Sequence, residues 1–161
     1  MLRRRQVIPI VLSLFVVGAC DDDTTDPEPE TFSATLTGAA ERPNPVTTDA
    51  SGSADFTVRG SSVDFEIRAE NLEDATAAHI HGPAGTDQAA GVLVTLFVGD
   101  PPEDVADGVL VNSSFPSATN TLATGITMDS VLVLMRNGNA YVNVHTLENQ
   151  PGEIRGQVSS N

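Results

Sequence analysis

The chain has 161 residues, with 8 basic and 22 acidic side chains, a formal net charge of −14 at pH 7 and one cysteine. This balance argues against a surface for nucleic acid or anionic lipid, because both need clustered positive charge. A single cysteine excludes an intramolecular disulfide framework, and the length fits one folded domain.

Residues 1–19 have the pattern of a lipoprotein signal peptide. A cationic start is followed by an apolar run over residues 7–17, which is too short for an ordinary membrane span. The run ends in Val17-Gly18-Ala19-Cys20, which resembles a bacterial lipobox. We therefore expect Cys20 to be lipidated and to anchor the protein in a bacterial cell envelope, outside the cytoplasm. The sequence does not decide between the inner and the outer membrane. A plain signal peptide or an N-terminal anchor helix is the alternative.

Residues 20–31 predict a tether between this anchor and the folded domain. The segment is acidic, contains proline and has no large apolar residue after Cys20. Such a segment cannot bury enough surface to offset the entropy of ordering, so we expect it to be disordered. Residues 32–161 then form the folded domain.

The first part of that domain predicts β-strands. Apolar and polar residues alternate with period two over 32–37, 54–59 and 63–70. Gly60-Ser61 between the last two segments predicts a hairpin turn.

Further strands are predicted at 92–98, 109–115, 139–146 and 153–159. The first of these is apolar on both faces, which predicts a central, covered strand. The acidic, proline-containing segment 99–108 predicts a solvated loop. Short strands separated by turn signals favour a mostly β fold, an antiparallel sandwich or barrel.

One segment, near residues 128–137, predicts a short helix instead. Met128, Val131, Leu132 and Met135 have the spacing of one helix face, and Gly138 is a suitable C-terminal stop. A strand is the alternative, because the run Val-Leu-Val-Leu also has high β propensity.

Two stretches carry a resemblance to a known family. They are AHIHGPAG at 78–85 and NAYVNVHT at 139–146, the latter continuing to PGEIRGQ at 151–157. Together with the opening at 32–58, they resemble the CHRD domain, named after repeats in animal chordin and found alone in bacterial secreted proteins. The resemblance implies a β-rich extracellular domain with no settled activity.

All three histidines of the chain lie in these stretches. Residues at i and i+2 of a strand share a face, so His79 and His81 point away from the core if Ile80 points into it. In the C-terminal hairpin, Val142 and Val144 must share the core with Ile154 and Val158. This parity places His145 on the polar face, together with Glu153 and Arg155.

Three imidazoles on rigid strands predict a metal site of His79, His81 and His145. Neutral imidazole suits copper or zinc, and three ligands leave an open coordination position. Copper is preferred by analogy with the His-x-His strand of copper-zinc superoxide dismutase, whose further ligands this chain lacks. We expect the metal to be lost as the imidazoles protonate, roughly between pH 7 and 5.

Four polar residues are expected around this site. Asn143, Glu148 and Glu153 could accept or donate hydrogen bonds that orient the imidazoles and fix their tautomers. Arg155 would repel a cation unless Glu153 or Glu148 neutralises it. Alternatively, the histidines only form hydrogen bonds across the sheet.

Three functions remain open. The first is a lipid-anchored envelope binding module that holds a metal or an envelope protein. The others are a copper- or zinc-dependent enzyme and a purely structural envelope protein. The chain has no Gly-x-Ser-x-Gly elbow and no phosphate-binding glycine loop, which leans against an enzyme. No catalytic residue is therefore predicted.

Overall fold

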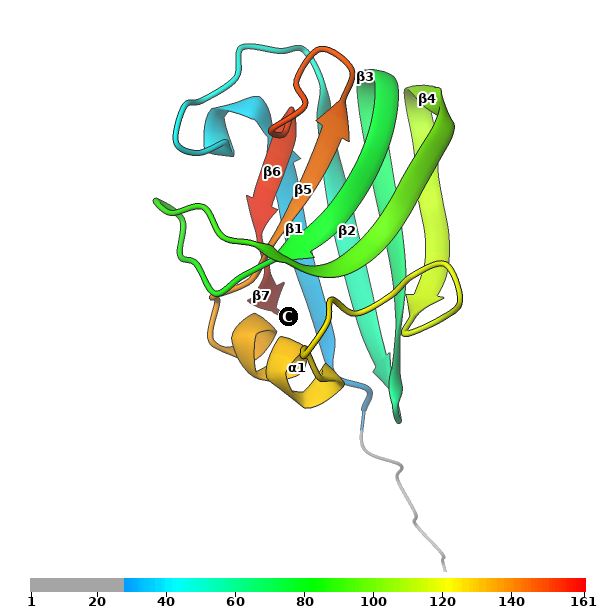
Figure 1. Cartoon of the computed structure of the whole chain (residues 1–161), viewed down its shortest axis with the longest axis vertical. Helices are drawn as coiled ribbons and strands as arrows, with labels where there is room; N and C mark the ends of the chain where they lie inside the picture. Colours follow the sequence, from blue (N-terminus) through cyan, green and yellow to red (C-terminus); the bar gives the residue numbers. More distant parts are fainter. Residues whose placement is uncertain (1–27) are drawn as a thin grey trace, which may run out of the picture.

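The computed structural model describes residues 28–161 (Figure 1). The predicted signal peptide and Cys20 lie outside the described residues. No helix among residues 28–161 has the length and apolar character needed to cross a membrane. The elements are β1 (Thr31–Thr37), a 3₁₀ turn (Gly38–Ala40), β2 (Ser51–Arg59), β3 (Ser62–His81), β4 (Val92–Phe115), α1 (Met128–Arg136), β5 (Tyr141–Thr146), β6 (Ile154–Gln157) and β7 (Ser159–Ser160).

The strands form a closed antiparallel barrel, which confirms the mostly β prediction and selects the barrel over the sandwich. Their order is β2-β1-β6-β5-β3, and pairing of β2 with β3 closes the ring of five strands. β4 extends the sheet beside β3, and β7 pairs with β1. The predicted hairpin at Gly60-Ser61 is present, because Arg59 pairs with Ser62.

The barrel interior holds the apolar residues of the alternating strands. Phe32, Leu36, Ile80 and Val142 are fully buried there. Phe65 packs between two further phenylalanines, with ring centroids 6.3 Å from Phe56 and 5.9 Å from Phe115. This continuous apolar core is the main stabilising term of the fold.

The predicted helix is confirmed as α1, which lies at one end of the barrel (Figure 1). The Thr127 side chain caps its first turn by accepting a hydrogen bond from the backbone N–H of Ser130. Its apolar face closes that end of the core with Val131, Leu132 and Met135.

The prediction for residues 92–108 is wrong in two respects. β4 continues through the expected loop 99–108, and it lies at the edge of the sheet rather than at its centre. An edge position tolerates Pro101 and Pro102, which lack the N–H that a central strand needs. Residues 121–123 lie along this edge, with Ala123 N–H donating to the Leu93 carbonyl.

Contacts with the barrel extend one residue before β1, to Glu30. Glu30, which the composition assigns to the tether, accepts two hydrogen bonds from Arg136 at 2.6 and 2.7 Å. Its carbonyl also accepts a hydrogen bond from the Val58 N–H. These contacts attach Glu30 to the barrel and to the end of α1.

Candidate functional site: a three-histidine cluster

The three histidines come from two neighbouring strands. β3 pairs with β5 so that His79 lies opposite Asn143, His81 opposite Tyr141, and His145 opposite Ala77. The side chains of one register pair share a face of the sheet. All three imidazoles therefore stand on the same outer side of the barrel.

The parity argument for the C-terminal hairpin is confirmed. Val144 pairs with Ile154 and Asn143 pairs with Arg155 in the β5–β6 register. Val142, Val144 and Ile154 are fully buried in the core. The odd-numbered residues of β5, including His145, accordingly project to the opposite face.

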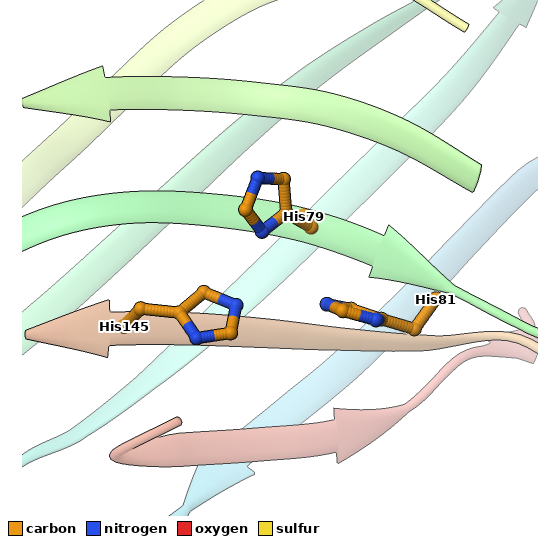
Figure 2. Close-up of side chains that lie close together, drawn as sticks. All are labelled: His79, His81 and His145. Carbon is orange, nitrogen blue, oxygen red and sulfur yellow. The ribbon is translucent and has the colours of Figure 1, made fainter. Parts of the chain in front are cut away.

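The rings converge, as Figure 2 shows. Ring centroids lie 5.0 Å apart for His79 and His145, 5.5 Å for His79 and His81, and 5.7 Å for His81 and His145. One nitrogen of each ring lies within 4.8 Å of the other two. In a tetrahedral zinc site the ligand nitrogens are about 3.4 Å apart, given Zn–N bonds of about 2.0–2.1 Å. Small side-chain rotations would bring the three nitrogens onto one ion.

The polar face that carries the cluster is largely buried. His81 is 8% exposed, Tyr141 2% and Arg155 2%, while His79 and His145 are half-buried. Residues 82–91 contribute to this cover through backbone hydrogen bonds to Arg155 and Tyr141. The alternation correctly predicted which way these side chains point, but gave no signal that loops cover them.

Backbone carbonyls fix the orientation of two rings. His81 Nδ1 lies 3.0 Å from the Ala90 carbonyl oxygen, and His145 Nδ1 lies 2.9 Å from that of Gln150. A carbonyl only accepts, so each Nδ1 carries the proton and donates it. Each Nε2 is then left as an unprotonated lone pair, the form in which imidazole binds a metal.

Three of the other four ring nitrogens are buried and unsatisfied. His79 Nδ1, His81 Nε2 and His145 Nε2 are buried without a hydrogen-bond partner among the described residues. An unpaired buried polar group costs about 1–3 kcal/mol, so three in one cluster are a substantial penalty. A metal ion bound by all three nitrogens would remove that penalty.

The cluster is neutral at physiological pH. Burial, together with a smaller effect of the neighbouring imidazoles, lowers the pKa of His79 and of His81 to about 4. Burial also lowers the pKa of His145. A metal ion would therefore displace no proton at pH 7. Protons should therefore compete with a metal ion for these nitrogens at a lower pH than the range of pH 7 to 5 expected from ordinary imidazoles.

The four other residues expected at the site do not contact the imidazoles through hydrogen bonds. Asn143 donates to the Pro151 carbonyl, and the Glu153 carboxylate accepts from the hydroxyls of two threonines at 2.6 and 2.7 Å. Arg155 donates to loop carbonyls, and Glu148 is exposed. The carbonyls of Ala90 and Gln150, which no side-chain pattern could predict, hold the rings instead.

Two further residues were not found by sequence reasoning. Glu41 is 3% exposed, and burial raises the pKa of its carboxyl to about 7. Asn143 donates to the Glu41 Oε2 at 3.4 Å, and the Glu41 Oε1 has no hydrogen-bond partner in the described part of the chain. Tyr141, the one tyrosine of the chain, stacks on His81 with ring centroids 5.0 Å apart. Its place on the polar face of β5 was the available signal, whereas Glu41 lies in an irregular segment without periodicity.

The comparisons with known proteins bear on the whole barrel. The model of the CHRD domain family matches residues 32–158, which include all three histidines. Neither curated proteins nor solved structures gave a match. The matched range covers most of the chain and confirms the resemblance of the two histidine-containing stretches. The chain therefore belongs to the CHRD domain family.

Proposed function

We propose that the protein is a metal-binding module that holds one copper or zinc ion through His79, His81 and His145. The observation that carries this proposal is the convergence of three buried ring nitrogens that have no hydrogen-bond partner within residues 28–161. Two of these rings already present an unprotonated nitrogen, because carbonyls hold the proton on the other nitrogen. Little reorganisation is needed before metal binding.

The donor set supports copper or zinc over other biological cations. Calcium and magnesium prefer oxygen ligands, whereas imidazole suits zinc, copper and nickel. Three neutral ligands add no negative charge, so a divalent ion keeps its full charge at the site. A fourth ligand such as water or an anion would complete tetrahedral coordination.

We also propose that Cys20 carries a lipid that anchors this module in a bacterial cell envelope. The lipobox-like sequence before Cys20 supports the proposal, as does its distance from Glu30, where contacts with the barrel begin. Cys20→Ser should move the processed protein from the detergent phase to the aqueous phase. Equal partitioning of both proteins into water would contradict lipidation.

Isothermal titration calorimetry of residues 21–161 with zinc and with copper tests the metal site. We expect one ion per chain for the natural sequence and loss of that binding when all three histidines are replaced by alanine. The chain is strongly acidic, so a control must exclude binding to carboxylates. Replacing Asp55, Asp64 and Glu66 by alanine removes three neighbouring acids elsewhere on the sheet. Loss of binding in this control, or equal uptake by the triple histidine variant, would contradict the proposal.

A further inference from the structure

The ring of Tyr141 stands between a metal-ligand candidate and a buried arginine. Its plane is stacked on the imidazole of His81, with an angle of 8° between the planes. The Arg155 Cζ lies 3.5 Å from the centroid of the same ring. Because β5 lies between β6 and β3, the phenol separates the guanidinium from the imidazole. Such contacts restrict the position of each group, and aromatic rings favour a stacked cation.

Both Tyr141 and Arg155 also hold the loop of residues 82–91. Arg155 Nη2 donates to the carbonyls of Gly85 at 3.1 Å and Gln88 at 2.8 Å. The Tyr141 hydroxyl accepts from the Ala90 N–H at 3.0 Å and lies 3.3 Å from the Ala90 carbonyl, to which it donates. The tip of this loop, residues 86–89, is exposed, so these polar contacts are important for its attachment.

The Ala90 carbonyl connects this arrangement to the cluster. It accepts from the Tyr141 hydroxyl and from His81 Nδ1, as two lone pairs allow. If the loop moved away, nothing would keep the His81 proton on Nδ1, and the ring would populate the tautomer that protonates Nε2. That tautomer cannot bind a metal through Nε2.

We propose that Tyr141 and Arg155 are positioning residues of the three-histidine cluster, which fix the loop of residues 82–91 so that His81 presents a free Nε2 to the metal ion. This inference rests on the proposed function. Coupling is reciprocal, so a metal ion on His81 Nε2 also orders the loop. We therefore expect the loop of residues 82–91 to become more ordered when the metal binds.

Tyr141→Phe tests this proposal with the least disturbance. The variant keeps the stacked ring and removes both contacts to Ala90. We expect zinc affinity to fall about 10- to 100-fold, the usual effect of losing an outer partner of a metal-bound histidine. Arg155→Lys keeps the charge but loses the planar fork, and should weaken zinc binding in the same direction. It serves as the second variant if Tyr141→Phe does not fold.

Gln157→Met is the matched control. Gln157 holds the other end of the same loop by donating to the carbonyls of Ala84 and Gly138, and it does not contact Ala90. We expect its zinc affinity to stay within about threefold of the natural sequence, because the contact of His81 with Ala90 is retained. An equal loss in Gln157→Met and Tyr141→Phe would overturn the proposal, since the affinity would then not depend on the Ala90 contact through which Tyr141 is proposed to act on His81.

Nitrogen-15 NMR of the imidazoles in the metal-free chain separates this inference from the proposed function. We expect His81 to be protonated on Nδ1 in the natural sequence and to become a mixture of tautomers in Tyr141→Phe. Hydrogen exchange of amides 84–91 should slow when zinc is added to the natural chain, and less so in the variant. If the natural chain binds no zinc, the proposed function fails, but the NMR result still decides the positioning role. An unchanged His81 tautomer in both Tyr141→Phe and Arg155→Lys would overturn the inference.

Discussion

The two faces of β5 are both buried, yet they are built differently. Val142 and Val144 project into the barrel and are fully buried among apolar side chains. Tyr141, Asn143 and His145 project to the other side, where loops and neighbouring polar side chains cover them. On this outer face, buried side-chain atoms without a partner among the described residues belong to Glu41, His79, His81, Asn143, His145 and Gln157.

The two faces therefore contribute differently to the stability of the fold. The inner face gains free energy by removing apolar surface from water. The outer face buries polar nitrogens and oxygens without pairing them, which opposes folding. The proposed metal site would offset part of this penalty, because an ion bound by the three imidazoles would pair the histidine nitrogens.

The largest expected difference between the two faces is in the free energy of unfolding when neighbouring residues of β3 are substituted. Ile80→Ala opens a cavity in the barrel core and should lower the free energy of unfolding by about 2–5 kcal/mol. His79→Ala removes a ring with an unpaired buried nitrogen and should cost less than about 1 kcal/mol. Urea denaturation of the two metal-free variants measures both values. Equal destabilisation would show that the outer face contributes to stability as the core does.

Metal affinity should respond in the opposite way: on the same strand, substitution of a histidine should matter more than substitution of a core residue. His81→Ala removes one of three ligands and should weaken zinc binding by at least about 100-fold, equivalent to about 2.7 kcal/mol. Ile80→Val, a conservative core change, should leave zinc affinity within about threefold. Competition with a zinc-sensitive dye gives both constants. Zinc binding by His81→Ala as tight as that of the natural sequence would remove His81 from the site.

The pH dependence of stability should also be dominated by the outer face. The folded-state pKa of His79 and of His81 is lowered to about 4, so the unfolded chain binds more protons between about pH 6.5 and 4. Their contribution to stability is complete above pH 6.5 and is lost as the pH falls towards 4. Denaturation of the metal-free chain at several pH values should show this decline, and the double variant His79→Gln, His81→Gln should reduce it. The same decline in both proteins would contradict the lowered pKa values.

Glu41 should show a smaller effect of opposite sign. Burial raises the pKa of its carboxyl to about 7, so its contribution to stability is complete below pH 4.5 and is lost as the pH rises through 7. Glu41→Gln is neutral at every pH, so it avoids the cost of a buried carboxylate. It should stabilise the protein by at least about 1 kcal/mol at pH 8, the lower end of the cost of an unpaired buried polar group, and by much less at pH 5, where Glu41 itself is largely protonated. A stabilisation independent of pH would contradict a carboxyl that titrates near neutrality.

The sequence predicted those features that depend on periodicity. Alternation over β3 and β5 predicted which side of each strand faces the core. Placing Ile154 in the core with Val142 and Val144 predicted which side chains of the hairpin share a face, but not the register itself. Spacing of three and four residues predicted α1. These patterns suffice because each strand or helix must bury one apolar face.

The features without periodicity could not be predicted. Proline and acidic residues at 99–108 are typical of loops, and only the edge position of β4 makes them compatible with a strand. The loop of residues 82–91 covers His81 through backbone carbonyls, which carry no sequence signal. Glu41 is one acidic residue in an irregular segment, so its burial beside Asn143 depends on tertiary contacts alone.

Zinc K-edge X-ray absorption of residues 21–161 loaded with one equivalent of zinc tests the central claim most directly. The three-histidine site predicts three imidazole nitrogens at about 2.0–2.1 Å, with the outer-shell scattering of the rings, and one additional light ligand. His81→Ala should lose one imidazole from this spectrum. A first shell of carboxylate oxygens without imidazole scattering would contradict the account, because the zinc would then be bound by the acidic surface and not by the histidine cluster.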